Sequence, residues 1–476
     1  MASNDTPTSA KERIHSPASS LKHELHVGKG IASRIASKDA MRDLHNMKAS
    51  LRLLLLVLLV SALMGVAAWA FLASLDFVTE QREAHLWLFA LLPIVSVATA
   101  WVYRTHGLRA ARGNNLVIDS SLTGTPIHAR MAGLTFVCSV ATHLAGGSAG
   151  REGTAVQIGG TIASNVAQLF KLSGRDRKDL MLAGISAAFG GVFGTPLAGA
   201  FFGMEMCTLG KLTYSAGMYC LVASFAGDGM ARLLGTQHSF QPIAHVPTMT
   251  PSTVALVLIC AVVFGLVARL FSFSIRVVKK FWGHRVRSYL LAALLSSLVL
   301  MGTYMIFGLQ RYGGLSEWMV ASGFKGQTTW YDPALKLLCT ALTLGAGYQG
   351  GEVTPLFGIG ASLGGWIATI TGSDPSFMAA LGLLGVFGAA LNVPITTIML
   401  GIDMFSGKAA AYFVIVAFVS YLVAGHRGVY PAQRIVTPKR RSLEFDEGDT
   451  VEHAIERHHE IVIEGEPANT ASNDNK

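Results

Sequence analysis

The chain has 476 residues, of which 51% are hydrophobic and only 14% are charged. Soluble proteins carry about 25% charged residues, so this composition excludes an ordinary soluble protein and indicates an integral membrane protein. The formal net charge of +9 does not indicate nucleic-acid binding, because Lys and Arg lie in loops and at the N-terminus, as on the cytoplasmic face of a membrane protein.

Residues 1–48 are polar and rich in Ser, Ala and His, with more basic than acidic residues. We expect a mostly flexible cytosolic tail here, with a surface helix over residues 31–47 as the alternative. Its four histidines are spaced too irregularly to predict a metal site; they are His15, His23, His26 and His45. Because the first apolar run begins only near Leu51, no secretory signal is expected.

Two apolar runs, at residues 51–75 and 86–103, are long enough to span a membrane, which takes about 20 residues. The loop between them is not net basic, whereas residues 104–112 carry three arginines. The positive-inside rule therefore places the N-terminus and residues 104–112 in the cytosol.

The next apolar runs are short and interrupted by Gly or Pro, at residues 129–145, 154–170, 179–193 and 196–208. Such lengths predict broken or re-entrant helices packed inside protein, where non-helical backbone is tolerated at membrane depth. A longer span is predicted at 212–234. Residues 235–251 contain no Lys or Arg, which indicates the outer face.

A glycine-rich break at residues 146–160, GGSAGREGTAVQIGG, places Arg151 and Glu152 between two apolar segments. Ionisable groups at membrane depth mark a transport pathway or pair with a partner. Glycines there leave backbone N–H groups free to point into a cavity, and the following helix offers a positive N-terminal end to an anion. The break therefore predicts an anion pathway.

The same break recurs in the second half, where residues 347–360 read GYQGGEVTPLFGIG. Five positions match at a constant offset: Gly147, Gly150, Glu152, Thr154 and Gly160 pair with Gly347, Gly350, Glu352, Thr354 and Gly360. A second match pairs residues 189–206 with 387–404, with Glu205 opposite Asp403. Shared Gly, Ala and Leu content is the alternative explanation, but two motifs that each preserve an acid indicate a repeat.

The loop predicted after a span at 253–275 is cytosolic, because it is basic and has no acid; it carries Arg276, Lys279, Lys280, Arg285 and Arg287. Its counterpart in the first half is placed outside, and equivalent loops on opposite faces indicate an inverted repeat. The predicted fold is an all-α polytopic membrane protein with broken or re-entrant helices. Two inverted-topology repeats, 49–235 and 252–430, are joined by an external linker, 236–251. The cytosolic tail, 431–476, is too short for an ordinary regulatory domain.

The repeat places Glu152 and Glu352 near the interface at which such transporters hold their ions. In a narrow, poorly hydrated path, desolvation raises the pKa of a carboxyl group and nearby helix N-termini lower it. A carboxyl group balanced in this way can take and release a proton. Once ionised, it can also occupy the place of an inorganic anion, which couples anion movement to proton movement. The alternative is a satisfied ion pair, such as Glu152 with Arg151. Glu205 and Asp403 are interpreted as structural acids near helix ends.

GREGT at residues 150–154 resembles the signature of the CLC chloride channel and transporter family. PLAGAFFGME (196–205), GGEVTP and Tyr430 in GHRGVY resemble later segments of that family, and the resemblance covers about 50–431. It implies a CLC-like fold, a homodimer with one pathway per subunit, and Glu152 as the external gate for protons and anions.

Departures from the chloride-handling members resemble the fluoride/proton antiporter branch, CLC-F. Asn114 stands where those members have a chloride-binding serine in a GSGIP-like motif. GEVTP replaces a GIFAP-like segment, which puts Glu352 and Thr354 beside the anion, and Thr154 replaces the proline of GREGP. Met206 replaces an internal proton-transfer glutamate, so the resemblance leaves the ordinary proton route in doubt and makes Glu352 the substitute.

Fluoride holds its water tightly and accepts strong hydrogen bonds, so a selective site must offer several close donors. Asn114 offers an amide, Thr354 and Tyr430 offer hydroxyls, and protonated Glu352 offers an acidic O–H. As alternatives, Asn114 caps a helix, Thr354 bonds its own helix backbone, and Tyr430 is an interfacial anchor. The predicted anion site comprises Asn114, Gly150, Arg151, Gly153, Gly351, Val353, Thr354 and Tyr430.

The sequence thus predicts a multi-pass protein of the plasma (bacterial inner) membrane, with both termini cytosolic, that exports fluoride in exchange for protons. No cofactor, metal or nucleic acid is expected, and the five cysteines are interpreted as small core residues. A chloride/proton antiporter or passive chloride channel is the first alternative; Asn114 and Met206 argue against the exchanger, and Glu152 against an ungated pore. An intramembrane enzyme using Glu152 and Glu352 as acid and base is the other, but no nucleophile or metal-ligand spacing accompanies them.

Overall fold

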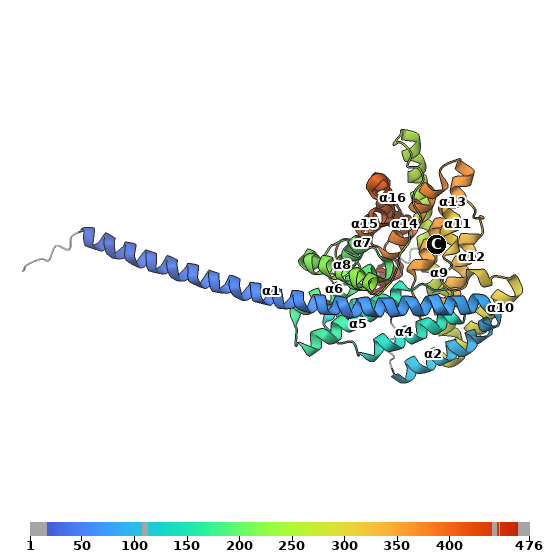
Figure 1. Ribbon diagram of the computed structural model, residues 1–476, viewed down its shortest axis with the longest axis horizontal. Helices are drawn as coiled ribbons and strands as arrows, with labels where there is room; N and C mark the ends of the chain where they lie inside the picture. The colour runs from blue at the N-terminus through green and yellow to red at the C-terminus, as the bar shows by residue number, and fades with distance from the viewer. Residues whose placement is uncertain (1–16, 107–112, 440–444, 447, 465–476) are drawn as a thin grey trace, which may run out of the picture. The chain divides into compact units, whose positions relative to one another are not determined.

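The structure, a computed structural model, describes residues 17–106, 113–439, 445–446 and 448–464. It comprises two units, Met1–Leu55 and Leu56–Lys476, and each is considered by itself. The described residues are almost entirely helical (Figure 1). Among them, six helices are long and apolar enough to cross a membrane by length and composition, and two shorter apolar helices accompany them.

The helices of the first repeat are α1 (Pro17–Ala84), α2 (Leu92–His106), α3 (Asn114–Thr123), α4 (Arg130–Leu144), α5 (Glu152–Leu169), α6 (Gly174–Phe193), α7 (Pro196–Glu205) and α8 (Gly217–Leu233). Those of the second are α9 (Pro251–Arg285), α10 (Tyr289–Phe307), α11 (Trp318–Phe324), α12 (Asp332–Gly345), α13 (Val353–Thr371), α14 (Pro375–Leu391), α15 (Pro394–Phe405) and α16 (Ala410–Ala424). The four short apolar runs correspond to α4, α5, α6 and α7. The prediction of an all-α membrane fold with broken helices is confirmed.

Close packing at glycines holds the short buried helices together. A Cβ atom added at Gly159 of α5 would lie 2.4 Å from the carbonyl oxygen of Gly184 in α6. In the second repeat, a Cβ atom at Gly360 of α13 would lie 2.2 Å from the carbonyl oxygen of Gly382 in α14. Small residues let apolar helices approach to backbone contact, where van der Waals packing replaces the missing hydrophobic driving force. These two contacts fix α5 and α13, whose first residues form the site.

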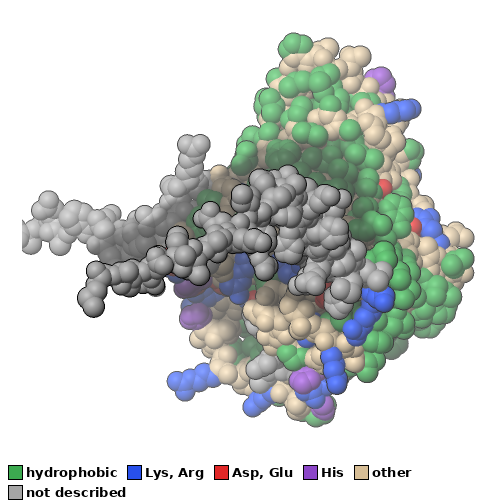
Figure 2. Space-filling model, turned by 90° about the vertical axis from the view of Figure 1, so that its left-hand side faces the viewer, with side chains coloured by type: hydrophobic (Ala, Val, Ile, Leu, Met, Phe, Trp, Pro, Cys, Tyr) green, Lys and Arg blue, Asp and Glu red, His purple; other side chains and the backbone are tan. Residues whose placement is uncertain are grey.

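Hydrophobic side chains cover a broad area of the face shown in Figure 2. Large apolar residues of α9 are exposed, among them Ile259, Leu266 and Phe273. A soluble monomer rarely exposes such a surface, whereas a lipid-facing surface requires it. All five cysteines are buried and free, as the sequence predicts for core residues.

Two predicted segments differ from the structure because helices continue through them. Residues 17–48 belong to α1, so the expectation of a mostly flexible tail is wrong there; residues 1–16 lie outside the described part. The predicted basic loop is also helical as far as Arg285, since α9 does not end at residue 275. Lys and Arg favour helix, and neither segment contains a proline after its first turn. Most of the predicted loop at 104–112 lies outside the described residues.

The segment after Tyr430 packs back on the end of the first repeat. Strand β2 (Arg434–Ile435) pairs in parallel with β1 (Thr208–Leu209). Leu209 and Ile435 form a small core with Val451 and Ala454, of which the last two come from α17 (Val451–Glu464). The described part of the tail is therefore an extension of the membrane unit through this core.

Helices α7 and α15 cap each other through the two acids that the repeat pairs. The N–H groups of Ile395 (3.0 Å) and Thr396 (2.8 Å), and the Thr396 hydroxyl (2.7 Å), donate to the carboxylate of Glu205. In return, the N–H of Ala198 donates to Asp403 Oδ2 (2.8 Å). A carboxylate at a helix N-terminus satisfies free N–H groups and the helix dipole. The interpretation of both residues as structural acids is confirmed.

We expect Glu205→Ala to lower the free energy of unfolding by about 1–3 kcal/mol, because it leaves buried N–H groups without an acceptor. Asp403→Ala should be less destabilising, since fewer hydrogen bonds are lost. Thermal unfolding midpoints in detergent test this order. A Glu205→Ala protein as stable as the unmodified chain would contradict the capping role.

Candidate functional site

The two glycine-rich breaks meet in the structure through their backbones. The N–H of Gly150 donates to the carbonyl of Gly351 (2.7 Å), and the N–H of Gly351 donates to that of Gly150 (2.6 Å). A Cβ atom at Gly351 would lie 2.6 Å from the Gly153 nitrogen, so a side chain there would force the two segments apart. This junction sets the N-termini of α5 and α13 side by side, and helix N-termini favour anions.

The carboxyl group of Glu152 is buried at this junction and bonded to the opposite repeat. The Thr354 hydroxyl donates to Oε1 (2.5 Å), and the N–H groups of Thr354 and Arg151 donate to Oε2 (both 3.1 Å). These donors come from the first turn of α13 and from the residue just before α5. The carboxyl group therefore takes the position that an anion would take at these two helix ends.

Arg151 contacts two acids rather than Glu152 alone. Its Nε atom is 3.5 Å from Glu152 Oε1, and its Nη1 atom is 3.4 Å from Glu317, whose side chain is 64% exposed. The ion pair that the sequence offered as an alternative is thus present. It accounts for only part of the surroundings of Glu152, because the hydrogen bonds that described residues donate to the carboxyl group come from Thr354 and from the backbone N–H of Arg151.

Glu352 and Asn114 converge on Gly153 from different elements. A Cβ atom at Gly153 would lie 2.9 Å from Asn114 Nδ2 and 3.2 Å from Glu352 Oε2. The Asn114 amide donates to Tyr430 Oη (3.3 Å). Within the described part of the chain, Glu352 Oε2 and Asn114 Oδ1 are buried without a hydrogen-bond partner. Buried polar atoms without partners are rare and mark sites for water, ions or catalysis.

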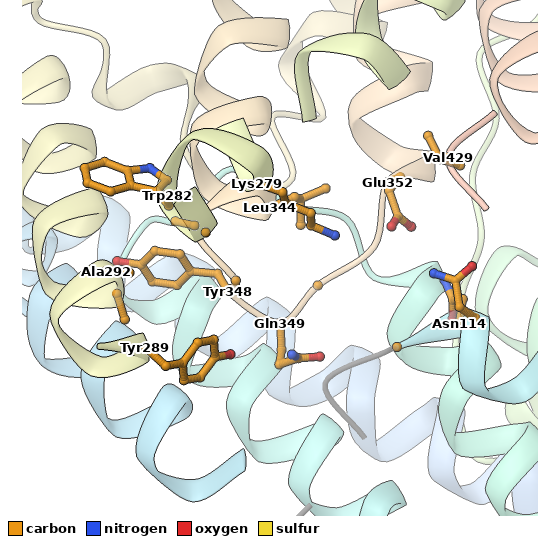
Figure 3. A pocket seen from close by; sticks show the side chains of 18 of the residues that line it. Asn114, Lys279, Trp282, Tyr289, Ala292, Leu344, Tyr348, Gln349, Glu352 and Val429 are labelled. Carbon is orange, nitrogen blue, oxygen red and sulfur yellow. The ribbon is translucent and has the colours of Figure 1, made fainter. Parts of the chain in front are cut away.

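Asn114, Glu352 and Tyr430 line a cavity of about 490 Å³. Figure 3 shows Asn114 and Glu352 on one side of this cavity and Trp282 and Tyr289 on the other. We call it the inner cavity, following the side that the sequence predicts to be cytosolic.

A second cavity, of about 690 Å³, is lined by Arg151 and Thr354 together with Asp76, Glu317 and Phe357; we call it the outer cavity. Glu152 lines neither cavity. Its carboxyl group bonds to Thr354 of the outer cavity, while Glu352 of the inner cavity precedes the same helix, α13. Glu152 and the glycine junction therefore separate the two cavities.

The structure places the predicted anion-site residues around the glycine junction, in two groups. The Thr354 hydroxyl bonds Glu152, and Thr354 lines the outer cavity, whereas Asn114 and Glu352 line the inner one. The N-cap of α3 is Gly113 and makes no side-chain hydrogen bond, so Asn114 is no cap. Tyr430 is fully buried, which excludes the interfacial anchor. Gly150, Gly153, Gly351 and Val353 form the buried junction.

Sequence reasoning missed Lys279, which lines the inner cavity, and Glu317, which contacts Arg151. The signal for Lys279 was present in the basic run after residue 275, which was interpreted as a loop. No local signal pointed to Glu317, because its contact with Arg151 joins the two repeats.

Comparisons with known proteins match most of the chain. A family described as voltage gated chloride channel matches residues 95–425. A chloride/fluoride channel protein of Pseudomonas syringae pv. tomato is 36% identical over 384 residues, which cover 79% of this chain and 85% of the relative. An H(+)/Cl(−) exchange transporter ClcA of Vibrio cholerae is 25% identical over 408 residues, which cover 79% of this chain and 85% of that protein.

Two solved structures resemble the fold over most of the chain. The crystal structure of a CLC-type fluoride/proton antiporter has a TM-score of 0.78 and 32% identity, covering 81% of this chain and 98% of that one. A slow cyanobacterial Cl−/H+ antiporter has a TM-score of 0.68 and 19% identity, covering 80% and 96%, and this likeness concerns the fold alone.

Proposed function

The chain belongs to the voltage gated chloride channel family, and from this premise we propose that it exports fluoride from the cytosol in exchange for protons. The observation that carries the proposal is the pair of glutamates at the glycine junction, one from each repeat: Glu152 is buried, and Glu352 is half-buried with its Oε2 atom buried. Glu152 is bonded towards the outer cavity and Glu352 lines the inner one. Each can exchange a proton with its own side, which an antiporter requires and a passive pore does not.

Protonation of Glu152 would free the site for an anion. The Thr354 and Arg151 donors bind an ionised carboxylate well, and a proton on that carboxyl group removes the charge that they stabilise. When Glu152 leaves, the same donors at the N-terminus of α13 can hold fluoride. The carboxyl group and the anion thus compete for one position, so that proton and fluoride movements are linked.

Glu352 supplies the proton step on the inner side. Met206 is buried and carries no titratable group, so the usual internal glutamate is missing. Glu352 in its protonated form can donate to fluoride beside the Asn114 amide and the Tyr430 hydroxyl, and in its ionised form it repels the anion. Fluoride is favoured as the anion by this donor set, by the 36% identical chloride/fluoride channel relative and by the 32% identical fluoride/proton antiporter.

We further propose a homodimer in the bacterial inner membrane with both termini in the cytosol. The Pseudomonas and Vibrio relatives are bacterial proteins. The basic end of α9 and the inner cavity would face the cytosol. Each subunit would carry its own pathway, since one chain supplies all the residues of the site described above.

The test uses purified protein in liposomes, with fluoride and chloride efflux measured with and without a proton ionophore. Fluoride efflux that drives proton uptake is the expected result. Proton-coupled efflux of chloride in preference to fluoride would favour the chloride/proton antiporter instead, and anion efflux without proton movement would favour a passive channel.

We expect Asn114→Ser to reduce the preference for fluoride over chloride by about tenfold, the effect of roughly 1.5 kcal/mol from one lost hydrogen bond. The shorter hydroxyl cannot keep the position that the amide holds against Tyr430. Flux ratios in liposomes measure the change. Asn115→Ser is the matched control, because the Asn115 side chain accepts from the N–H of Ala432 instead; an unchanged ratio in Asn114→Ser would place selectivity elsewhere.

A further inference from the structure

The inner cavity carries basic side chains for which the proposed mechanism has no use. Lys279 and Arg287 line it, and Glu352 is the only acid among its described lining residues. The Lys279 ammonium forms no hydrogen bond or ion pair with another described residue. Figure 3 shows its side chain reaching into the cavity near that of Glu352. The cavity therefore offers a mobile anion two cationic groups.

Packing of α9 against α12 fixes the position of Lys279. A Cβ atom at Gly345 would lie 2.4 Å from Val278 Cγ1, so only a glycine allows α9 to come this close to the end of α12. Val278 immediately precedes Lys279, and the close contact sets the root of the lysine side chain at the cavity wall. Lys280, the next residue, is exposed as Lys279 is, but it does not line the cavity.

We propose that Lys279, assisted by Arg287, forms a capture site for small inorganic anions in the inner cavity. An entering anion would reach this site before it reaches Asn114 and Glu352. The site rests on the proposed function and adds its entry step. A lysine ammonium is a compact charge on a flexible stem, so it attracts an anion that still holds its water. A cavity with low-dielectric walls and a net charge of one sign raises the local concentration of the opposite ion, and here two basic side chains outnumber the one acid. Asn114 and Glu352 then receive an anion already concentrated beside them.

Capture of this kind changes the anion concentration needed for transport more than the transport rate at saturation. It also depends on ionic strength, because exposed charges are screened over a Debye length of about 8 Å at 0.15 M salt. These two properties distinguish capture from a role in which Lys279 acts through Glu352, which would alter turnover and proton coupling at any fluoride concentration.

The experiment compares Lys279→Gln with Lys280→Gln in proteoliposomes, measuring the initial rate of fluoride transport against fluoride concentration at low and at high potassium gluconate. Lys279→Gln should raise the half-saturating concentration about 3- to 10-fold at low salt, within the range that electrostatic focusing gives. The difference should shrink at high salt and at saturating fluoride. Lys280→Gln should match the unmodified chain.

Charge rescue supplies the second variant. In Lys279→Cys, a cationic thiol reagent should restore the half-saturating concentration and a neutral reagent of similar size should not, since the five native cysteines are buried. The proposal is overturned if Lys279→Gln behaves like Lys280→Gln, if only the saturated rate or the proton coupling falls, or if both reagents rescue equally. If the unmodified chain carries chloride in place of fluoride, the proposed function fails but the same comparison is made with chloride.

Discussion

Glu152→Gln is expected to abolish proton-coupled fluoride transport, lowering fluoride-driven proton uptake by about two orders of magnitude or more, as loss of a proton-transfer group commonly does. Glutamine cannot ionise, so it can neither carry the proton nor act as the anion that closes the junction. One of its two terminal atoms is also a donor and would face the Thr354 or Arg151 donors. Anion flow either stops or persists as an uncoupled leak, and both outcomes agree with the gate.

Proton uptake and fluoride efflux recorded in the same liposomes measure the coupling. Glu317→Gln is the matched control, because Glu317 is an exposed acid that also contacts Arg151, and its loss should leave the coupling in place. Coupling at the unmodified level in Glu152→Gln would refute the assignment of the gate.

Glu352→Gln is expected to leave fluoride binding in place while proton-coupled turnover falls severely. The amide keeps the shape of the side chain and a donor for fluoride beside Asn114, but it removes the only titratable carboxyl group among the described residues that line the inner cavity. A pKa difference of one unit corresponds to about 1.4 kcal/mol, so a modest change in proton affinity on fluoride binding suffices for coupling. Removing the titration removes that linkage.

Fluoride binding to the detergent-solubilised protein, measured by calorimetry, separates this effect from misfolding, since an unfolded variant would bind nothing. Asn115→Ser serves again as a variant of the same cavity wall that should keep turnover. Normal fluoride-driven proton uptake in Glu352→Gln would exclude the carboxyl group and point to a path through water or through Tyr430.

Several features of the fold followed from local pattern. The short apolar runs correspond to α4–α7 because helix length and hydrophobicity are read from neighbouring residues. The repeated glycine motif correctly placed Glu152 and Glu352 at one junction, since inverted repeats carry their equivalent segments to a shared interface. The pairing of Glu205 with Asp403 in sequence likewise became a pair of mutual helix caps.

Other expectations failed where a local pattern allows two structures. A polar segment such as 17–48 can be a flexible tail or the start of a helix, and the basic run after residue 275 can be a loop or a helix end. In both cases the helix of the neighbouring apolar span extends through the polar segment, because propagation adds one hydrogen bond for each residue fixed. The expectation from the resemblance that Thr354 and Glu352 lie beside one anion stays a prediction; in the structure Thr354 bonds Glu152 and lines the outer cavity, whereas Glu352 lines the inner one.

The sequence by itself determined that the chain lies in a membrane, where its apolar helices fall and which glutamates meet, because hydrophobicity and glycine spacing are properties of neighbouring residues. Only the tertiary structure decided which donor faces which acceptor. Thr354 bonds Glu152 across 202 positions and Asn114 bonds Tyr430 across 316. Lys279 enters the inner cavity only because α9 packs against Gly345. Such contacts depend on how helices from both repeats pack, and no local spacing encodes that arrangement.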